Sequence, residues 1–507
     1  TQASGIVVTG TNEVTLAGIN WTDGNGASRL VVAKAGSAVD AFPVDGANYA
    51  ASTNFGGGTQ IGTGNYVVWA GSGPIGGLKN LLRDQSYHLR VFEFNGTLGT
   101  TANFLTNAAS GNPYSLKTMA VVPGGNPTDL AISPIGTNGF TVTWTKGTTG
   151  TNTLIVIRAG GNPVDPTDLN SYTADPIFGN GSNLGSSSFV VYNGTGSSVA
   201  VTNLAPGTSY TVEASSFNGS GGSENYRGTP ASATASTLMP EPTQASAIAF
   251  GTLGATSYAV SFTAGNGLSR LVVAKQGSAV DWTPTDGTAY AGENNAFGSG
   301  TDLGGGNYLV HRGASPFTLS GLTAATDYHL RIFEYQGTNA TLNYNVAAAS
   351  GNPSNRYALS TEPTAHGTLS ATALSDTEIK LDWTDATGES GYLIVRQAAD
   401  AGWTAPADGT AYTAGNALGA GTVVYAGTAA GAGSYTNGSL SADTTYYYRI
   451  YPYAYDGTPA NATYNYLTGG TPGSANATTG KSEPGASSSV VSFLPASGTT
   501  ATIAWTN

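Results

Sequence analysis

The sequence predicts an all-β chain in which similar units follow one another. Internal repetition is the first observation: the heptapeptide Ser28-Arg-Leu-Val-Val-Ala-Lys34 returns unchanged as Ser269-Arg-Leu-Val-Val-Ala-Lys275. Second, apolar and polar residues alternate over short runs rich in Val, Ile, Thr and Tyr, which is the period of a β-strand. Third, the chain has 72 Gly among 507 residues, and each Gly in a helix interior costs about 1 kcal/mol relative to Ala. We therefore expect repeated units of β-strands along the whole chain.

The repeating unit is about 120 residues long. In each unit an aromatic residue closes a short alternating run, and successive copies lie 123, 118, 121 and 122 residues apart: Trp21, Trp144, Phe262, Trp383 and Trp505. We predict that these five side chains lie in the cores. Clusters of Pro, Glu and Thr mark the boundaries, because Pro fixes φ and keeps the preceding residue extended.

These boundaries predict repeat 1 at residues 1–122, repeat 2 at 123–241, repeat 3 at 242–362, repeat 4 at 363–483 and the start of an incomplete repeat 5 at 484–507. Thr1-Gln-Ala-Ser4 also returns as Thr243-Gln-Ala-Ser246. From the partial repeat 5 and this match we expect further repeats beyond Asn507 and before Thr1.

Strands and turns can be placed within each repeat. The runs Leu30–Lys34 and Leu154–Arg158 predict half-buried strands. Asn95-Gly96 and its counterparts tolerate the positive φ of two-residue hairpins. A second pattern, Pro-x-Asp-Gly-x-x-Tyr, predicts a tight turn whose Tyr returns to the core, as at Pro43–Tyr49.

A Leu followed six residues later by Tyr opens the penultimate strand of every complete repeat. This spacing predicts a tyrosine corner, in which the phenol hydrogen-bonds to backbone a few residues upstream. The four pairs are Leu81 and Tyr87, Leu204 and Tyr210, Leu322 and Tyr328, and Leu440 and Tyr446.

The early-strand Trp, a cation that closes the third strand and the tyrosine corner together resemble fibronectin type III domains, within the wider group of immunoglobulin-like β-sandwiches. The cations are Lys34, Arg158, Lys275 and Arg396. The resemblance covers essentially the whole chain and implies a tandem array of such sandwiches. Units of about 120 residues exceed the usual sandwich of about 100, and the excess lies between the third strand and the corner Leu.

Finer motifs resemble fibronectin-like repeats in secreted and surface proteins of Bacteroidota: the Pro-Asp-Gly turn, Gly64-Asn-Tyr-Val-Val68, Arg90–Gly96 and Gly111-Asn-Pro113. Members of that group include large cell-surface adhesins exported by the type IX system, such as the giant gliding-motility adhesin. The resemblance implies an extracellular, cell-surface location.

Charge and composition exclude several functions. The chain carries 18 Lys and Arg against 30 Asp and Glu, for a net charge of −12. No segment concentrates cations as phosphate backbones require, which argues against nucleic acid as a partner. No apolar run is long enough to cross a bilayer, so we expect no membrane insertion in this segment. With no Cys, thiolate catalysis and disulfides are excluded.

No pattern predicts a catalytic, cofactor or metal site. Glu93 and Glu334 stand in matching positions, but repeats 2 and 4 have Ser216 and Pro452 there, and separate sandwiches offer no shared cleft for paired carboxylates. The four His residues follow no ligand spacing. We interpret the acidic residues around the Pro-Asp-Gly turns as turn formers, such as Asp40, Asp45, Asp281 and Asp286, and leave calcium binding by these turns open.

We therefore predict a structural stalk segment of a long bacterial surface adhesin or filament, which presents a distal adhesive region and is not itself an enzyme. The expected partners are neighbouring repeats of the same longer chain, with surface polysaccharide or other envelope proteins as further candidates. Two alternatives remain: an array of carbohydrate-binding modules on a secreted polysaccharide-degrading enzyme, with sugars on Trp69, Trp282 and Trp403, and a self-assembling extracellular fibre.

Overall fold

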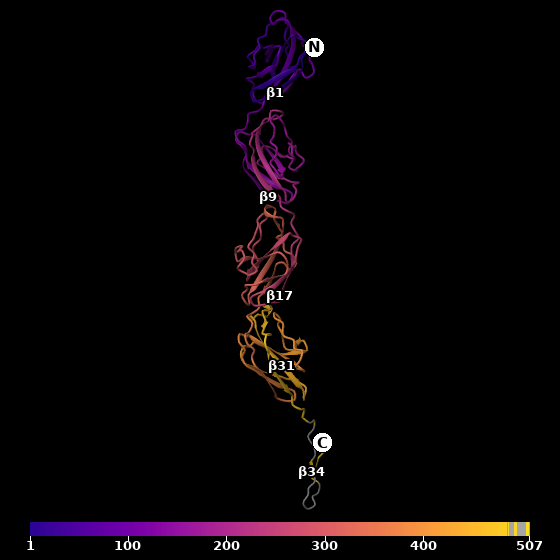
Figure 1. Cartoon of the computed structure of the whole chain (residues 1–507), viewed down its shortest axis with the longest axis vertical. Coiled ribbons are helices and arrows are strands. Elements are labelled where there is room, and N and C mark those ends of the chain that lie inside the picture. Colours follow the sequence, from indigo (N-terminus) through magenta and orange to yellow (C-terminus); the bar gives the residue numbers. More distant parts are fainter. Residues whose placement is uncertain (484, 486–490, 494–502, 506–507) are drawn as a thin grey trace, which may run out of the picture. The chain divides into compact units, whose positions relative to one another are not determined.

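The computed structural model describes residues 1–483, 485, 491–493 and 503–505. Across these residues the chain is all-β, and all strand pairs within sheets are antiparallel (Figure 1). The helical content of the described part is two short 3-10 turns, η1 (Asn339–Thr341) and η2 (Pro459–Asn461). None of the described helices is long and apolar enough to cross a membrane.

The chain divides into two compact units. The first unit contains Thr1–Pro240 and Gly337–Asn343, and the second contains Glu241–Gln336 and Tyr344–Asn507. The strands form pairs of sheets, and each pair falls within one predicted repeat.

In repeat 1, a three-stranded sheet faces a five-stranded sheet. The smaller sheet has the order β1 (Ser4–Thr11), β2 (Leu16–Thr22), β5 (Ile75–Leu78). The larger has the order β4 (Asn65–Gly71), β3 (Ser28–Ala35), β6 (Ser86–Asn95), β7 (Asn103–Phe104), and β8 (Tyr114–Lys117) also pairs with β6.

Repeat 2 has the same sheet order. Its smaller sheet is β13 (Ser198–Val201), β10 (Phe140–Thr145), β9 (Thr128–Ile135), and its larger sheet is β12 (Phe189–Gly194), β11 (Asn152–Ala159), β14 (Ser209–Asn218), β15 (Asn225–Tyr226), with β16 (Ala231–Ser236) on β14.

Repeats 3 and 4 follow this pattern. In repeat 3 the smaller sheet is β17 (Ser246–Leu253), β18 (Tyr258–Thr263), β21 (Phe317–Leu319). Its larger sheet is β20 (Asn307–Arg312), β19 (Ser269–Gln276), β22 (Asp327–Gln336), β23 (Asn343–Tyr344), with β24 (Ser354–Tyr357) on β22.

In repeat 4 the smaller sheet is β25 (Leu369–Ala373), β26 (Ile379–Trp383), β30 (Gly433–Asn437). Its larger sheet is β28 (Ala417–Leu418), β29 (Gly421–Gly427), β27 (Gly391–Gln397), β31 (Thr445–Ala454), β32 (Asn465–Tyr466), with β33 (Gly473–Thr478) on β31. The last hairpin pairs β34 (Val491–Phe493) with β35 (Ile503–Trp505).

The main core of each repeat lies between its two sheets. In repeat 1, Ile6 and Ile19 from the small sheet pack with Val31 and Val91 from the large sheet. A second apolar cluster covers the other face of the large sheet, where Leu30 and other buried residues pack against the long segment between β3 and β4.

The central strand β3 is therefore buried on both faces. All four residues from Leu30 to Ala33 are inaccessible to solvent. The prediction of a half-buried strand was wrong here, because the residues by which the repeat exceeds an ordinary sandwich cover the face that would otherwise meet water.

The aromatic residues predicted to lie in the cores differ in how deeply they are buried. Trp144, Phe262 and Trp383 are buried in their cores. Trp21 is only half-buried against its core, and its indole Nε1 donates to Asp23 Oδ1 at 3.1 Å. Trp505 ends β35, and its side chain lies outside the described residues.

The Asn-Gly turns are not two-residue hairpins. Gly96 has the expected positive φ of 88°, but six more residues follow before β7 begins at Asn103. A side chain at position 96 would place Cβ 2.2 Å from the Thr101 carbonyl oxygen, so Gly is required by close approach as well as by φ. The sequence pair correctly marks the end of β6 and misses the loop that follows it.

Candidate functional site at the junctions between repeats

Each complete repeat contains a tyrosine whose phenol oxygen accepts a hydrogen bond from the backbone N–H five residues upstream. Three of these tyrosines are fully buried, Tyr446 is half-buried, and the Leu six residues before each is buried. The contacts are Leu82 N to Tyr87 Oη (2.8 Å), Ala205 N to Tyr210 Oη (2.8 Å), Thr323 N to Tyr328 Oη (2.9 Å) and Ser441 N to Tyr446 Oη (3.0 Å).

The tyrosine of each Pro-Asp turn makes a second contact of the same kind. Its phenol accepts from the backbone N–H five residues earlier: Val44 N to Tyr49 Oη (2.8 Å), Thr167 N to Tyr172 Oη (3.0 Å), Thr285 N to Tyr290 Oη (3.1 Å) and Ala407 N to Tyr412 Oη (3.1 Å). These tyrosines are half-buried on the outer face of the large sheet. In each repeat this hydrogen bond closes a turn within the long segment that follows the third strand.

The aspartate of the same turn connects it to the short strand that follows the penultimate one. Its Oδ1 accepts from the backbone N–H of an aromatic residue: Phe104 to Asp45 (2.8 Å), Tyr226 to Asp168 (2.7 Å), Tyr344 to Asp286 (2.8 Å) and Tyr466 to Asp408 (2.8 Å). The carboxylates around these turns thus have a structural partner in every repeat.

Three of those aromatic residues are tyrosines, and their hydroxyls return a hydrogen bond to the turn. Tyr226 Oη donates to the Asn170 carbonyl at 2.9 Å, and Tyr466 Oη donates to the Thr410 carbonyl at 3.0 Å. Burial raises the pKa of both phenols, so both remain protonated donors at neutral pH. The turn and the short strand are therefore joined by hydrogen bonds in both directions.

The asparagine directly before Tyr226 and the one directly before Tyr466 bind the segment that leaves the preceding repeat. In the first unit, Asn225 Nδ2 donates to the Ala120 carbonyl at 2.8 Å, and the Ala120 N–H donates to the Ser223 carbonyl at 2.9 Å. In the second unit, Asn465 Nδ2 donates to the Ser360 carbonyl at 2.7 Å.

The Ser360 N–H completes the second junction by donating to the Thr463 carbonyl at 2.9 Å. Asn225 and Asn465 are each only 6% exposed. The same reciprocal pair thus occurs in both units, and it recognises backbone groups of the linker.

Further contacts strengthen the junction in the first unit. Asn218 Nδ2 donates to the Val121 carbonyl at 2.8 Å. Lys117 Nζ lies 2.7 Å from Asp84 Oδ1 and donates to the Ser220 carbonyl at 2.9 Å. The hydrogen bond from Lys117 lowers the pKa of Asp84. Repeats 1 and 2 therefore share a polar interface.

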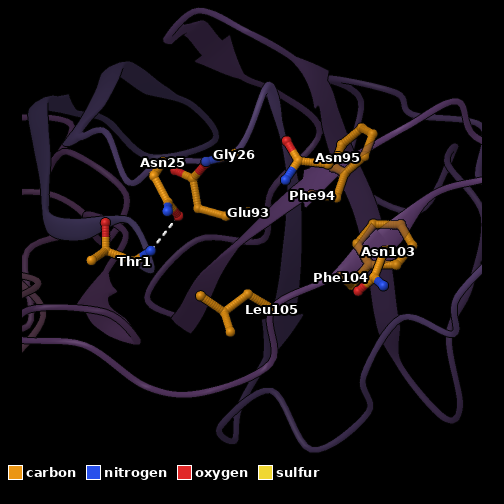
Figure 2. A pocket seen from close by; sticks show the side chains of 9 residues that line it. All are labelled: Thr1, Asn25, Gly26, Glu93, Phe94, Asn95, Asn103, Phe104 and Leu105. Atoms are coloured by element: carbon orange, nitrogen blue, oxygen red, sulfur yellow. Dashed lines mark hydrogen bonds between the residues drawn. The ribbon is translucent and has the colours of Figure 1, made fainter.

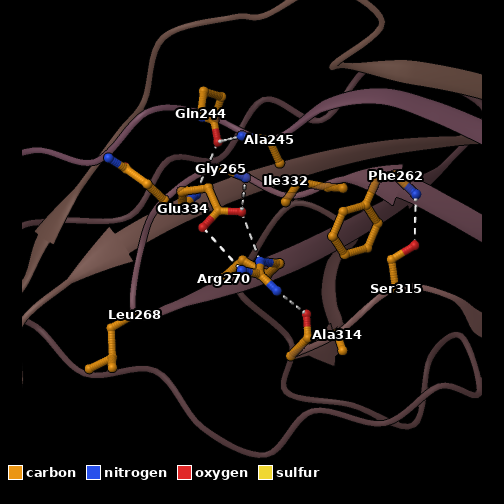
Figure 3. A network of polar contacts seen from close by, with 12 residues as sticks. Gln244, Ala245, Phe262, Gly265, Leu268, Arg270, Ala314, Ser315, Ile332 and Glu334 are labelled. Carbon is orange, nitrogen blue, oxygen red and sulfur yellow. Dashed lines mark hydrogen bonds and ion pairs between the residues drawn. The ribbon is translucent and has the colours of Figure 1, made fainter.

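A buried ion pair holds the loop between the second and third strands in repeats 1 and 3. Glu334 is fully buried, and its Oε1 accepts from Arg270 Nε at 2.8 Å and from the Gly265 N–H at 3.0 Å (Figure 3). In repeat 1, Glu93 Oε1 accepts from Arg29 Nε at 2.8 Å. Each glutamate fastens a loop in its own repeat, so the two are not paired with each other.

The cations that close the third strands have local partners. Lys34 Nζ lies 2.6 Å from Asp40 Oδ1, and Lys275 Nζ lies 2.8 Å from Asp281 Oδ1. Arg396 lies over the Tyr446 ring, 5.1 Å from its centroid. Hydrogen bonds from Lys275 and Asn307 lower the pKa of Asp281 to about 2.

The remaining candidate residues pack within their own repeats. Trp282 makes edge contacts with Tyr290 and Phe333, at centroid distances of 4.9 and 5.9 Å, and Arg449 lies 4.8 Å from the Trp403 centroid. Trp69 is half-buried against the core of repeat 1. In the described part of the chain, His, Asp and Glu form no group of three that could hold a metal ion.

The junction asparagines were missed by the sequence reasoning. A usable signal exists: an Asn followed by Phe or Tyr recurs at Asn103, Asn225, Asn343 and Asn465, with spacings of 122, 118 and 122. The dipeptide is short, and only the structure shows that its two members face different partners, one the Pro-Asp turn and the other the linker.

Sheet order, tyrosine corners and the succession of repeats along the chain define a tandem array of fibronectin type III-like β-sandwiches. No family model matches the chain, and no curated protein matches it. Among solved structures, it is similar to the FN1–FN3 domains of chicken CNTN1, with 16% identity, a TM-score of 0.26, and coverage of 71% of this chain and 100% of that one.

Two further solved structures are similar. A segment of two fibronectin type III domains from chicken tenascin has 15% identity, a TM-score of 0.21, and coverage of 43% of this chain and 97% of that one. The central fibronectin-III array of RIM-binding protein has 11% identity, a TM-score of 0.15, and coverage of 53% and 82%. The assignment of the fold rests on the geometry described above.

Proposed function

We propose that this chain is a structural segment of an extracellular stalk: a row of sandwiches that spaces and presents a distal region of a longer bacterial surface adhesin or filament. The observation that carries the proposal is the repeated junction, in which Asn225 holds the Ala120 carbonyl and Asn465 holds the Ser360 carbonyl. Polar contacts that recur at junctions, and that bind the backbone of the next unit, suit a protein whose partners are its own neighbouring repeats.

The repeats themselves support this proposal. The two carboxylates considered for acid/base catalysis, Glu93 and Glu334, are both occupied by structural contacts. Glu93 is bound by Arg29 and two backbone amides, and Glu334 is bound by Arg270 and the Gly265 N–H. The tryptophans suggested for sugar stacking pack within their own repeats. We place the segment at the cell surface of a bacterium with type IX export, on the strength of the sequence motifs that resemble such adhesins.

Excision of one period tests the proposal. Removing residues 125–242 joins Gly124 to Thr243, which restores a linker of ordinary length. A stalk whose repeats contribute nearly additively should keep the remaining repeats folded and still support export and adhesion in the parent cell. Hydrogen exchange on the purified chain and adhesion of the deletion strain are the measurements.

A composite binding site would respond differently. If an array of carbohydrate-binding modules were the function, excision should abolish glycan binding while surface display stays normal. That result, together with loss of adhesion, would refute the stalk. A matched control replaces residues 125–242 by a second copy of residues 243–362, which belong to repeat 3. This restores the number of repeats without the original repeat 2.

A further inference from the structure

The penultimate strand of the large sheet carries a basic residue at one position in repeats 1, 3 and 4, and an acidic residue there in repeat 2. Strand register establishes the correspondence, because each of the four residues lies opposite a Val of the third strand. The pairs are Arg90 and Val32, Glu213 and Val156, Arg331 and Val273, and Arg449 and Val395. Repeat 2 therefore reverses the charge at a position that the other repeats keep basic.

The arginine of repeats 1, 3 and 4 packs on an aromatic ring. The guanidinium carbon lies 4.6 Å from the ring centroid for Arg90 and Phe42, 5.1 Å for Arg90 and Phe92, 4.8 Å for Arg331 and Phe333, and 4.8 Å for Arg449 and Trp403. Such a cation is attracted by the negative face of the ring. Each of these guanidinium groups is therefore bound within its own repeat.

Repeat 2 lacks both aromatic partners of this stack. Ser215 stands five residues after the corner tyrosine, where repeat 1 has Phe92. The segment before the Pro-Asp turn is also two residues shorter, Val164–Pro166 against Val39–Pro43, and has no counterpart of Phe42. What remains is a pocket of about 200 Å³, lined by Asp165, Asp168, Ser215, Tyr226 and Gly228 among others.

This pocket lies where repeat 1 places the arginine head group. Phe104 in repeat 1 (Figure 2) and Tyr226 in repeat 2 are counterparts on the short strand, and they are followed two residues later by Thr106 and Gly228. The Thr106 carbonyl accepts from Arg90 Nη2 at 2.6 Å, whereas Gly228 lines the pocket. The pocket therefore occupies the space that a guanidinium group fills in repeat 1.

The polar groups at the pocket are buried without a partner. Glu213 is 9% exposed and Ser215 is 3% exposed, and within the part of the chain that the structure describes neither side chain has a hydrogen bond or an ion pair. Burial, and then the charge of Asp165, raise the pKa of Glu213. Because an unpaired buried carboxylate is costly, the pocket lacks a cation that these groups would accept.

Neither arginine of repeat 2 supplies that cation. Arg227 lines the pocket but is exposed, and its Nη1 donates to the Pro123 carbonyl at 3.4 Å. Arg158, on β11, donates from Nη1 to the Asn162 carbonyl at 2.9 Å. The missing cation must therefore come from another molecule.

We propose that this pocket binds the guanidinium group of an arginine side chain from another protein molecule. A planar guanidinium donates to several acceptors at once, and Glu213, Asp165 and the Ser215 hydroxyl provide them. Asp165 and Gly228 are exposed, so a side chain can enter from solvent. The inference goes beyond the stalk function and does not rest on it, because a stalk in which repeat 2 bound nothing would still space its distal region.

Binding of the peptide acetyl-Gly-Arg-Gly-amide to the full chain tests the proposal by calorimetry. We expect Glu213→Gln to weaken binding about tenfold or more, because hydrogen bonds to charged groups contribute more than neutral ones. Asp129→Asn, which removes an exposed carboxylate from the smaller sheet of the same repeat, should leave the affinity unchanged. Saturating peptide should also lower the midpoint of the Glu213 carboxyl NMR titration, since a bound cation favours the ionised form. Equal affinity in the unchanged chain and in Glu213→Gln would overturn the proposal.

A variant that fills the pocket gives a second measurement. Glu213→Arg combined with Ser215→Phe reproduces the pair of Arg331 and Phe333 and should abolish peptide binding. Hydrogen exchange of repeat 2 checks that the double variant is folded, and the comparison with Glu213→Gln does not depend on it. Peptide binding that persists in the folded double variant would place the ligand elsewhere and refute the site.

Other occupants give different results. The proposal fails if acetyl-Gly-Lys-Gly-amide binds as tightly as the arginine peptide, since guanidinium recognition would then be absent. It also fails if calcium at about 1 mM, in the range that extracellular modules bind, displaces the peptide, or if free ethylguanidinium binds equally well. Dimerisation in light scattering that is lost in Glu213→Gln would support the site and identify the other molecule as a second copy of this chain.

Discussion

Asn225 and Ala120, more than a hundred residues apart in the sequence, are joined by a side-chain amide that donates to a backbone carbonyl at 2.8 Å. The amide is almost fully buried, and the N–H of Ala120 is bound by the Ser223 carbonyl two residues before Asn225. Both backbone polar groups of Ala120 in the linker, its carbonyl and its N–H, are therefore hydrogen-bonded to repeat 2, through Asn225 and Ser223.

Asn225→Ala should loosen this junction and leave both sandwiches folded. Loss of a buried hydrogen bond whose acceptor is left unpaired costs about 1–3 kcal/mol, so exchange of the Ala120 amide should become about 5- to 150-fold faster. Asn180→Ala, at an exposed position in the same repeat, is the control. Unchanged exchange at Ala120 would show that the contact contributes nothing to the junction.

Tyr87→Phe should destabilise repeat 1 by about 1–3 kcal/mol, because the Leu82 N–H loses its acceptor while the ring still fills the core. Tyr66→Phe removes a hydroxyl from a half-buried ring on β4 and should change stability by less than about 0.5 kcal/mol. Urea unfolding followed by hydrogen exchange of repeat 1 peptides gives both values. Similar losses in the two variants would refute the role of the corner.

Arg270→Met should destabilise repeat 3 by about 3–5 kcal/mol, since it leaves the carboxylate of Glu334 buried without its cation. The double variant Arg270→Met with Glu334→Leu should recover part of this loss, because no buried charge remains. A double-mutant cycle by chemical denaturation measures the coupling. Losses that simply add would contradict a direct interaction.

Asp281 predicts a pH dependence with a defined sign. Hydrogen bonds from Lys275 and Asn307 lower its pKa to about 2 from the ordinary 3.8, so the folded state binds this proton less readily than the unfolded state. The stabilisation is complete above about pH 4 and is lost as pH falls towards 2. A carboxyl NMR titration should give a midpoint near 2 that rises in Lys275→Met. An ordinary midpoint in the unchanged chain would contradict the pairing.

The sequence predicts most of the fold because its main signals are local. Period-two runs locate the strands, and the six-residue spacing of Leu81 and Tyr87 marks a turn that closes on itself within one short segment. The loop after Gly96 and the second buried face of β3 were missed because both depend on residues far away in the chain: Phe104 binds Asp45, 59 residues before it. The junction was missed for the same reason, since Asn225 and Ala120 are 105 residues apart in the sequence.

Recognition of a linker by its peptide groups has a consequence for how such a chain can change over generations. A side chain that fits a particular pocket must be matched by its partner, and an inserted unit would break that match. The carbonyl of Ala120 and the carbonyl of Ser360 present the same atom to the same amide. We therefore expect that a gene segment encoding one unit can be duplicated, lost or moved without a matching change in the residue that the junction asparagine binds.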